Sequence, residues 1–295
     1  MLHTRPDQLR VLILSGSQRR QKNCPESDPK SRKMMKRMAD RLPKDWLIDS
    51  EDLGNVKEQS RIQPCNACVS TSMAMCVWPC NCYVKNSTTK PDLIWDLDLY
   101  ARLDLADAWA IIGPINWYAP TTNLKMLFDR LVCANGGNPR DDLIDNKDKD
   151  KAVALEHSPL WKELNVNHLE GRTAGFYVHG DEGAADIDDD GRPKMLRHKD
   201  YFNPADEPFA DGERDAYRPL VWQCRYSGIE VPDHLWRCQT IGKGKLYSEN
   251  QPDDLEDFSA FDSWVDDFAT FVAQKGKVEP GKYPAYNYDR SEHLA

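Results

Sequence analysis

The sequence lacks a segment that could cross a membrane. No apolar run among its 295 residues approaches the roughly 20 consecutive residues that a bilayer-spanning helix requires. The N-terminal stretch from Met1 to Arg10 is polar and has no apolar core of the kind that secretion signals carry. We therefore expect a cytoplasmic protein that does not bind membranes.

Positive charge is also scarce. The 39 lysine and arginine residues are outnumbered by 48 aspartate and glutamate residues, which gives a formal charge of −9. General nucleic-acid binders and proteins drawn to anionic membranes concentrate Lys and Arg on their surface, so this balance argues against both classes. An anionic cofactor is still allowed, because a few local donors can hold a phosphate.

Two nucleotide-binding motifs are missing as well. The sequence contains no GxGxxG turn and no GxxxxGK[ST] loop. The first absence argues against a GxGxxG dinucleotide-binding turn, and the second argues against a nucleoside triphosphatase.

The sequence does contain short apolar runs that alternate with helical patterns, which is typical of βαβ units and a parallel sheet. The predicted strands cover 10–14, 46–48, 108–113, 172–178 and 235–241. The predicted helices cover 31–41, 91–103, 121–133, 213–226 and 255–273. We therefore predict an α/β fold with a doubly wound, five-stranded parallel sheet and helices on both faces.

One domain is expected to hold all of these elements. It covers residues 1–276, with long polar loop insertions at about 135–170 and 181–212, and residues 277–295 form a tail. Ligands of such sheets bind beyond the carboxyl ends of the strands. The loops after the first, third and fourth strands are therefore the expected place for chemistry.

The first of these loops reads Ser15-Gly16-Ser17-Gln18-Arg19 and lies between a buried strand and a helix. Its backbone N–H groups, hydroxyls and arginine, together with the helix dipole, make a site for a phosphate. An ordinary polar connection with a Ser-Gly turn would have the same sequence. The loop alone does not separate the two interpretations.

Two segments together resemble a known family. The run from Leu12 to Arg20 (LILSGSQRR) resembles the SGS-x-R loop of the NADPH-dependent FMN reductases, a branch of the flavodoxin-like superfamily. The segment from Ala106 to Tyr118 is similar to that family's ADAIIIGSPVYFG motif. The helix from Thr121 to Leu131 is similar to the one that follows the motif in the family.

This resemblance implies a flavodoxin-like sheet with strand order 2-1-3-4-5, bound FMN, and NAD(P)H as the co-substrate. It also implies that the phosphate of FMN lies in the first loop and its ring against the loop after the third strand. The residues carried over for the phosphate are Ser15, Ser17, Gln18, Arg19 and Ser31. Those carried over for the ring are Pro114, Ile115, Asn116, Trp117 and Tyr118.

The loop after the fourth strand contains His179, Gly180 and Gly183. Its glycines suit a close approach of the backbone to the ring. His179 is either a contact of the ring or simply a histidine at the end of a strand, and both interpretations stay open.

Five cysteines crowd into one segment after the second strand, namely Cys65, Cys68, Cys76, Cys80 and Cys82. Four thiolates could hold a [4Fe-4S] cluster, as in the iron–sulfur flavoproteins, which carry a compact cysteine motif in the same loop with a different spacing. The cysteines could instead hold a structural zinc ion. In a third interpretation they bind no metal, and Cys65 and Cys68 form a redox pair.

The leading functional hypothesis is an NAD(P)H-dependent flavin oxidoreductase. It would pass electrons through FMN to a small acceptor such as a quinone, free flavin, a metal ion or a nitro or azo compound. Hydride transfer needs no catalytic acid or base, so the sequence predicts binding residues and no catalytic residue. The alternatives are a non-enzymatic FMN electron carrier and a scaffold protein without flavin. Because relatives in this family commonly assemble, we expect a homodimer or homotetramer.

Overall fold

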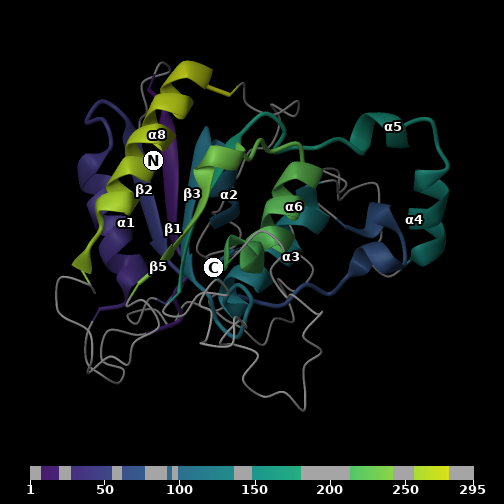
Figure 1. Cartoon of the computed structure of the whole chain (residues 1–295). Helices are drawn as coiled ribbons and strands as arrows, with labels where there is room; N and C mark the ends of the chain where they lie inside the picture. The colour runs from purple at the N-terminus through teal and green to yellow at the C-terminus, as the bar shows by residue number, and fades with distance from the viewer. Residues whose placement is uncertain are drawn as a thin grey trace, which may run out of the picture.

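A parallel sheet of five strands lies at the centre of the computed structural model, in the order β2-β1-β3-β4-β5 (Figure 1). The structure describes residues 8–19, 28–54, 62–76, 92–94, 99–135, 148–180, 213–241 and 256–278. The strands are β1 (Arg10–Ser15), β2 (Leu47–Asp52), β3 (Ala108–Pro114), β4 (Thr173–Gly180) and β5 (Trp236–Thr240). All neighbours pair in parallel. The predicted flavodoxin-like fold and its strand order are therefore confirmed.

The three central strands differ from the two edge strands in composition. β1, β3 and β4 are buried almost along their whole length, since helices cover both faces of a doubly wound sheet. The edge strand β2 reads LIDSED and contains no fully buried residue. Arg102 covers its polar face, with Nε 2.7 Å from Asp49 Oδ2 and Nη1 2.5 Å from Glu51 Oε2.

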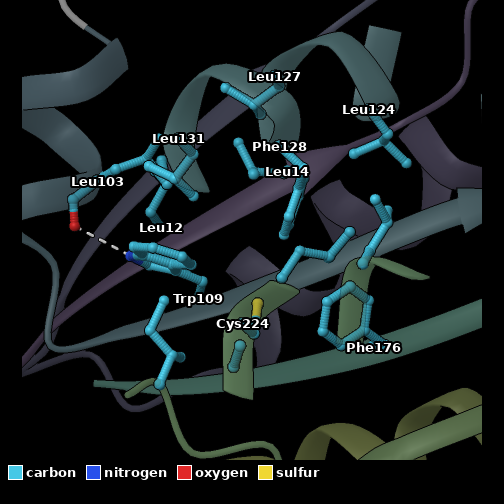
Figure 2. Close-up of a cluster of buried hydrophobic side chains, with 14 of the residues drawn as sticks. Leu12, Leu14, Leu103, Trp109, Leu124, Leu127, Phe128, Leu131, Phe176 and Cys224 are labelled. Atoms are coloured by element: carbon cyan, nitrogen blue, oxygen red, sulfur yellow. Dashed lines mark hydrogen bonds between the residues drawn. The ribbon is translucent and has the colours of Figure 1, made fainter. Parts of the chain in front are cut away.

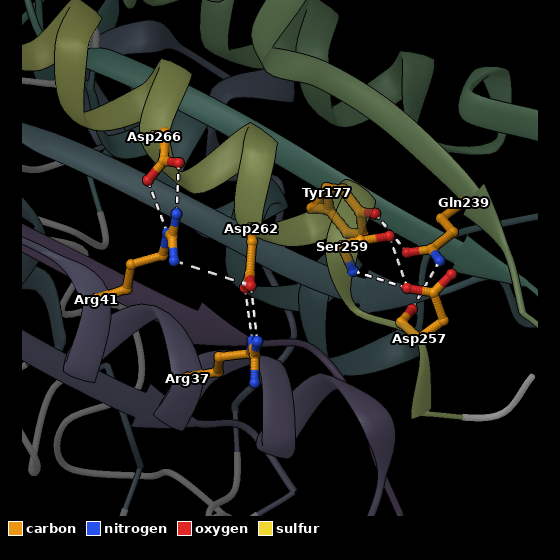
Figure 3. A network of polar contacts seen from close by, with 8 residues as sticks. All are labelled: Arg37, Arg41, Tyr177, Gln239, Asp257, Ser259, Asp262 and Asp266. Carbon is orange, nitrogen blue, oxygen red and sulfur yellow. Dashed lines mark hydrogen bonds and ion pairs between the residues drawn. The ribbon is translucent and has the colours of Figure 1, made fainter. Parts of the chain in front are cut away.

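Helices α1 (Lys30–Arg41) and α8 (Ser259–Lys275) cover one face of the sheet. The methionine stripe predicted for the first helix is core packing here, because Met34 and Met38 are fully buried against β1. Along their outer edges the two helices are joined by paired charges (Figure 3). Arg37 donates to both carboxylate oxygens of Asp262 at 2.5 and 2.6 Å, and Arg41 does the same to Asp266 at 2.7 and 2.5 Å.

Helices α2 (Leu99–Leu105), α3 (Thr122–Asn135) and α6 (Arg218–Tyr226) cover the other face, and the short helix η5 (Glu213–Tyr217) leads into α6. Figure 2 shows the apolar layer between these helices and the sheet. The indole of Trp109 is fully buried there, and its Nε1 donates to the carbonyl of Leu103 at 3.0 Å. This layer fixes α3 beneath the end of β3, where the candidate site begins.

One predicted helix differs from the structure at its start. Residues 92–94 lie within the predicted helix 91–103 but are not helical. The carboxylate of Asp92 is buried and accepts hydrogen bonds from Arg130 Nη1 at 2.6 Å and from the backbone N–H of Gln63 at 2.9 Å. These long-range contacts hold the backbone in a turn that overrides the local helical pattern.

The region predicted as the first insertion contains two helices, α4 (Lys149–Glu156) and α5 (Trp161–Leu164), which lie away from the sheet (Figure 1). α4 packs on the short helix η2 (Met73–Met75) of the cysteine segment. The second predicted insertion, 181–212, lies outside the described residues, as does most of the tail. Within the described part of the chain, no helix has the length and apolar content needed to cross a bilayer.

Candidate functional site

A cavity of about 310 Å³ opens at the carboxyl ends of the strands. It lies at the point where strand order reverses between β1 and β3, which is where open α/β sheets bind ligands. Residues from four strand ends and from the start of α1 line it, namely Ser17, Gln18, Arg19, Pro29, Lys30, Pro114, Ile115, Asn116, His179, Gly180 and Ile241.

The β1–α1 loop is held by close backbone contacts. The N–H of Gly16 donates to the carbonyl of Ile112 at 2.7 Å, and the carbonyl of Gly16 accepts from Thr121 Oγ1 at 2.6 Å. The turn after β2 packs against the same loop, because a Cβ on Gly54 would lie 2.4 Å from the backbone oxygen of Ser17. A backbone oxygen cannot move aside as a side chain can, so this approach requires glycine.

The start of α1 faces the cavity without a side-chain cap. Pro29 occupies the N-cap position, and the first turn contains no acidic residue. The first N–H groups of a helix have no partner within the helix, and the macrodipole places partial positive charge there. Lys30, the first helical residue, and Arg19, from the loop, bring two cationic side chains to the lining. This end of the cavity is therefore suited to an anion.

Arg32 connects the β1–α1 loop to α1. Its Nη2 donates to the carbonyl of Arg19 at 3.3 Å, and its Nη1 pairs with Asp28 at 3.0 Å. Its Nε donates to Asp52 at the end of β2. Because the guanidinium is buried and contacts three separate segments, it holds the loop in one position relative to the helix.

A serine and a histidine meet beneath the cavity. Ser31 Oγ and His179 Nε2 lie 2.7 Å apart, and both residues are buried. Burial, together with the charge of Lys30, lowers the pKa of His179 from 6.5 to about 3. The imidazole is therefore neutral at pH 7, and the hydroxyl of Ser31 forms one hydrogen bond with it.

The β3–α3 loop is anchored where it leaves β3. The carbonyl of Pro114 accepts from the hydroxyl of Tyr217 at 2.9 Å, and the N–H of Ile115 donates to the carbonyl of His179 at 2.9 Å. Burial raises the pKa of Tyr217, so its hydroxyl stays protonated and serves as a donor. The loop thereby keeps a fixed position beside β4.

At the tip of this loop, Asn116 and Ala119 exchange two backbone hydrogen bonds of 2.9 and 3.1 Å. The two residues between them, Trp117 and Tyr118, have φ values of 49° and 62°. Positive φ at both central positions is the geometry of a type I′ turn, which favours Asn and Gly. A side chain in the left-handed region costs about 1–2 kcal/mol per residue. Both aromatic residues are therefore held in strained conformations.

The predicted site residues separate into three groups. Those brought together on the cavity wall are Ser17, Gln18, Arg19, Pro114, Ile115, Asn116, His179 and Gly180. Those outside the wall are Ser15, which is fully buried, Ser31, which is buried against His179, and Trp117 and Tyr118, which are 93% and 49% exposed. Gly183 lies outside the described residues.

Gln18 has a structural role in addition to its place on the wall. With its amide oriented so that the oxygen faces α3, that oxygen accepts from the N–H groups of Thr122 at 3.1 Å and Asn123 at 2.9 Å. The side chain therefore caps the start of α3. Its backbone remains part of the β1–α1 loop.

Three lining residues were not predicted from the sequence, namely Pro29, Lys30 and Ile241. Lys30 and Pro29 lie one and two positions before Ser31, where the predicted helix began. The signal that could have identified them is the Pro-Lys pair at the start of a helix whose first turn lacks acidic residues.

The described part of the cysteine segment packs through η2 against α4, and none of its residues lines the cavity. Cys65 Sγ accepts from the N–H of Ala67 at 3.3 Å, and Asn66 Nδ2 donates to Cys68 Sγ at 3.7 Å. Cys76 is buried. No group of three or more His, Cys, Asp or Glu side chains in the described ranges is arranged to hold a metal ion. Cys80 and Cys82 lie outside those ranges.

The residues present fit a phosphate ester with an organic part. The cationic end formed by Arg19, Lys30 and the uncapped helix matches a phosphate. Pro114, Ile115 and Ile241 add apolar side chains to the lining. The volume of about 310 Å³ lies at the lower end of the range for small-molecule sites. FMN has both of these chemical parts.

No protein-family model and no curated protein matches the sequence. Among solved structures, an FMN-dependent NADH-azoreductase from Bacillus anthracis in complex with FMN is 12% identical, covers 90% of this chain and 99% of its own, and has a TM-score of 0.40. An NAD(P)H:quinone oxidoreductase from Methanothermobacter marburgensis is 12% identical, with 89% and 94% covered and a TM-score of 0.41. A putative quinone reductase from Klebsiella pneumoniae is 12% identical, with 92% and 87% covered and a TM-score of 0.45. Identities and scores of this size assign no function to the chain.

Proposed function

We propose that the protein is an FMN-dependent oxidoreductase that takes electrons from NAD(P)H and passes them to a small acceptor. Candidate acceptors are quinones, free flavin, metal ions and nitro or azo compounds. The observation that carries the proposal is the cavity at the β1/β3 switch point, which Arg19, Lys30 and the start of α1 line together with the loops after β3 and β4.

In this proposal the chain's own residues bind and orient. Arg19, Lys30 and the N–H groups at the start of α1 hold the phosphate, and Arg32 keeps the loop in place through the carbonyl of Arg19. Pro114, Ile115 and Asn116 face the ring. When bound, FMN supplies the hydride-transfer chemistry that no side chain here can perform.

For a quinone acceptor the reaction balances without a further reactant. NAD(P)H gives up a hydride, one proton comes from solvent, and the quinone becomes a hydroquinone as NAD(P)⁺ is formed. No acid or base within the protein is required, and His179, whose pKa is lowered to about 3, is neutral at pH 7.

The first test is binding. Titration of the purified protein with FMN, followed by the visible spectrum, is expected to reach saturation, whereas riboflavin binds at least about tenfold more weakly because each charged hydrogen bond to the phosphate contributes about 1.5–3 kcal/mol. Lys30→Met is expected to weaken FMN binding about tenfold and to leave riboflavin binding unchanged. Lys162→Met, an exposed change on α5 away from the cavity, is the matched control.

The second test is turnover. The FMN-loaded protein is expected to oxidise NADH or NADPH when menadione is added. A protein that takes up no FMN rules out the proposal altogether. A protein that binds FMN but oxidises neither nucleotide would instead be an electron carrier.

A further inference from the structure

The tip of the β3–α3 loop places large aromatic side chains where the backbone does not favour them. Trp117 and Tyr118 occupy the two positive-φ positions of a turn that Asn or Gly would form without strain. The hydrogen bonds between Asn116 and Ala119 hold the turn closed in spite of this. Strain of this kind, held in place by its surroundings beside a candidate site, points to a use for the side chains.

Packing does not account for Trp117. Its side chain is 93% exposed. Trp222, on α6, is 62% exposed but stacks on Tyr226 with ring centroids 5.3 Å apart. Within the described residues no comparable ring contact involves Trp117. The indole therefore adds almost nothing to the stability of the fold.

The position of Trp117 relates it to the cavity. Asn116, its immediate neighbour in the chain, is part of the cavity wall, so the backbone of Trp117 lies directly beside that wall. Along the chain, the exposed residues on either side of the two rings are Asn116 and Ala119, which have small side chains. A stable interface between two proteins buries about 800 Å² on each side, which a patch of two aromatic rings does not supply. A single flat ligand matches the patch in size.

We propose that Trp117 is a contact surface for a planar aromatic electron acceptor, which stacks on the indole at the rim of the cavity. The inference rests on the proposed function and narrows its substrate class to aromatic acceptors such as naphthoquinones. Offset stacking on a fully exposed indole buries flat apolar surface on both partners. The acceptor takes two electrons from NAD(P)H and one proton from solvent, as balanced above for a quinone.

Three variants test this proposal. Trp117→Gly removes the ring and suits the positive φ, Trp117→Phe keeps an aromatic ring, and Trp222→Ala removes a different exposed indole. With NADPH saturating, the ratio of kcat/KM for menadione to kcat/KM for ferricyanide, which has no aromatic ring, is expected to fall about tenfold in Trp117→Gly. It is expected to change less than about threefold in Trp117→Phe and not at all in Trp222→Ala.

Two further measurements do not depend on turnover. Calorimetric titration of the oxidised, FMN-loaded protein with anthraquinone-2-sulfonate is expected to give an affinity about tenfold lower for Trp117→Gly than for the parent. The melting temperature of Trp117→Gly is expected to rise by about 2–4 °C, because the strain at this residue is relieved. A variant that is more stable yet binds the acceptor less well has lost a binding contact rather than its fold.

The outcomes separate this inference from the proposed function. If FMN binds and menadione is reduced, but Trp117→Gly keeps the parent's acceptor ratio and anthraquinone affinity, the role of Trp117 is refuted and the oxidoreductase stands. If FMN does not bind, the proposed function and the role of Trp117 are both refuted. If Trp117→Gly instead converts a dimer to a monomer in sedimentation, the indole belongs to an interface between copies, and the inference is wrong.

Discussion

Ser31 Oγ at the start of α1 lies 2.7 Å from Nε2 of His179 at the end of β4, across 148 positions of sequence. This hydrogen bond joins two elements that both border the cavity. It gives the buried imidazole a neutral partner, and it takes up one of the hydrogen bonds that the hydroxyl of Ser31 can form. Loss of this hydrogen bond is therefore expected to reduce the stability of the fold more than it reduces ligand affinity.

Ser31→Ala is expected to lower the free energy of unfolding by about 1–3 kcal/mol, because His179 loses its partner while it remains buried. The affinity for FMN should stay within about threefold of the parent's, because the hydroxyl does not line the cavity. Urea unfolding and FMN titration measure the two quantities. Ser227→Ala is the control, since the buried Oγ of Ser227 has no hydrogen-bond partner within the described part of the chain and its loss should cost little. A large loss of FMN affinity at unchanged stability would show instead that Ser31 contacts the phosphate.

The pKa of His179 predicts how stability depends on pH. Its value falls from 6.5 to about 3 in the folded protein, because burial and the charge of Lys30 both disfavour the imidazolium. The unfolded chain therefore binds the proton more readily, so the contribution is complete above about pH 6.5 and is lost as the pH falls toward 3. Over the first two pH units of that range the loss is about 2–3 kcal/mol.

The contribution of His179 can be separated from that of the carboxylates by comparing the parent with His179→Gln, which cannot titrate. Urea unfolding at several values between about pH 7 and 4.5 should give a steeper loss of stability for the parent than for the variant. Parallel curves for the two proteins would contradict the assignment.

The sheet could be predicted from the sequence because its central strands are continuous apolar runs. The runs 10–14 and 108–113 read directly as buried strands, and the structure places β1 and β3 over them. The full length of the edge strand was harder to predict, because β2 extends to Asp52 through four polar residues. Asp49 and Glu51 pair with Arg102, more than 50 positions away, and Asp52 pairs with Arg32. No local pattern indicates such distant partners.

The candidate site was predictable as a set of loops but not as a set of side chains. The carboxyl ends of the strands identify the loops after β1, β3 and β4, and each of them contributes to the cavity wall. The direction of each side chain depends on distant partners instead. His179 is hydrogen-bonded to the hydroxyl of Ser31, and the closed turn leaves Trp117 exposed beside Asn116 of the cavity wall.

Arg32 is expected to couple stability to cofactor affinity. Arg32→Met removes the bond to the carbonyl of Arg19 and leaves Asp52 and Asp28, which are 12% and 24% exposed, without this cation. We expect a loss of about 2–4 kcal/mol in unfolding free energy and an FMN affinity about tenfold lower, because the phosphate loop is no longer held against α1.

The same helix offers a matched control for Arg32. Arg37 forms a two-fold hydrogen-bonded pair with Asp262, but it is exposed, so Arg37→Met should cost less than about 1 kcal/mol and leave FMN affinity unchanged (Figure 3). Equal losses of stability and affinity in both variants would show that Arg32 acts only as another surface charge.

Gly54 provides a test of the loop from its other side. An added Cβ would lie 2.4 Å from the backbone oxygen of Ser17 and 3.2 Å from that of Arg19. Gly54→Ala must therefore displace either the turn after β2 or the phosphate loop, at a cost of about 1–3 kcal/mol. Because the displaced atoms belong to the backbone that faces the phosphate, FMN affinity should fall about tenfold while riboflavin affinity changes much less. Equal weakening of both ligands would mean that the clash distorts the whole cavity rather than its phosphate end.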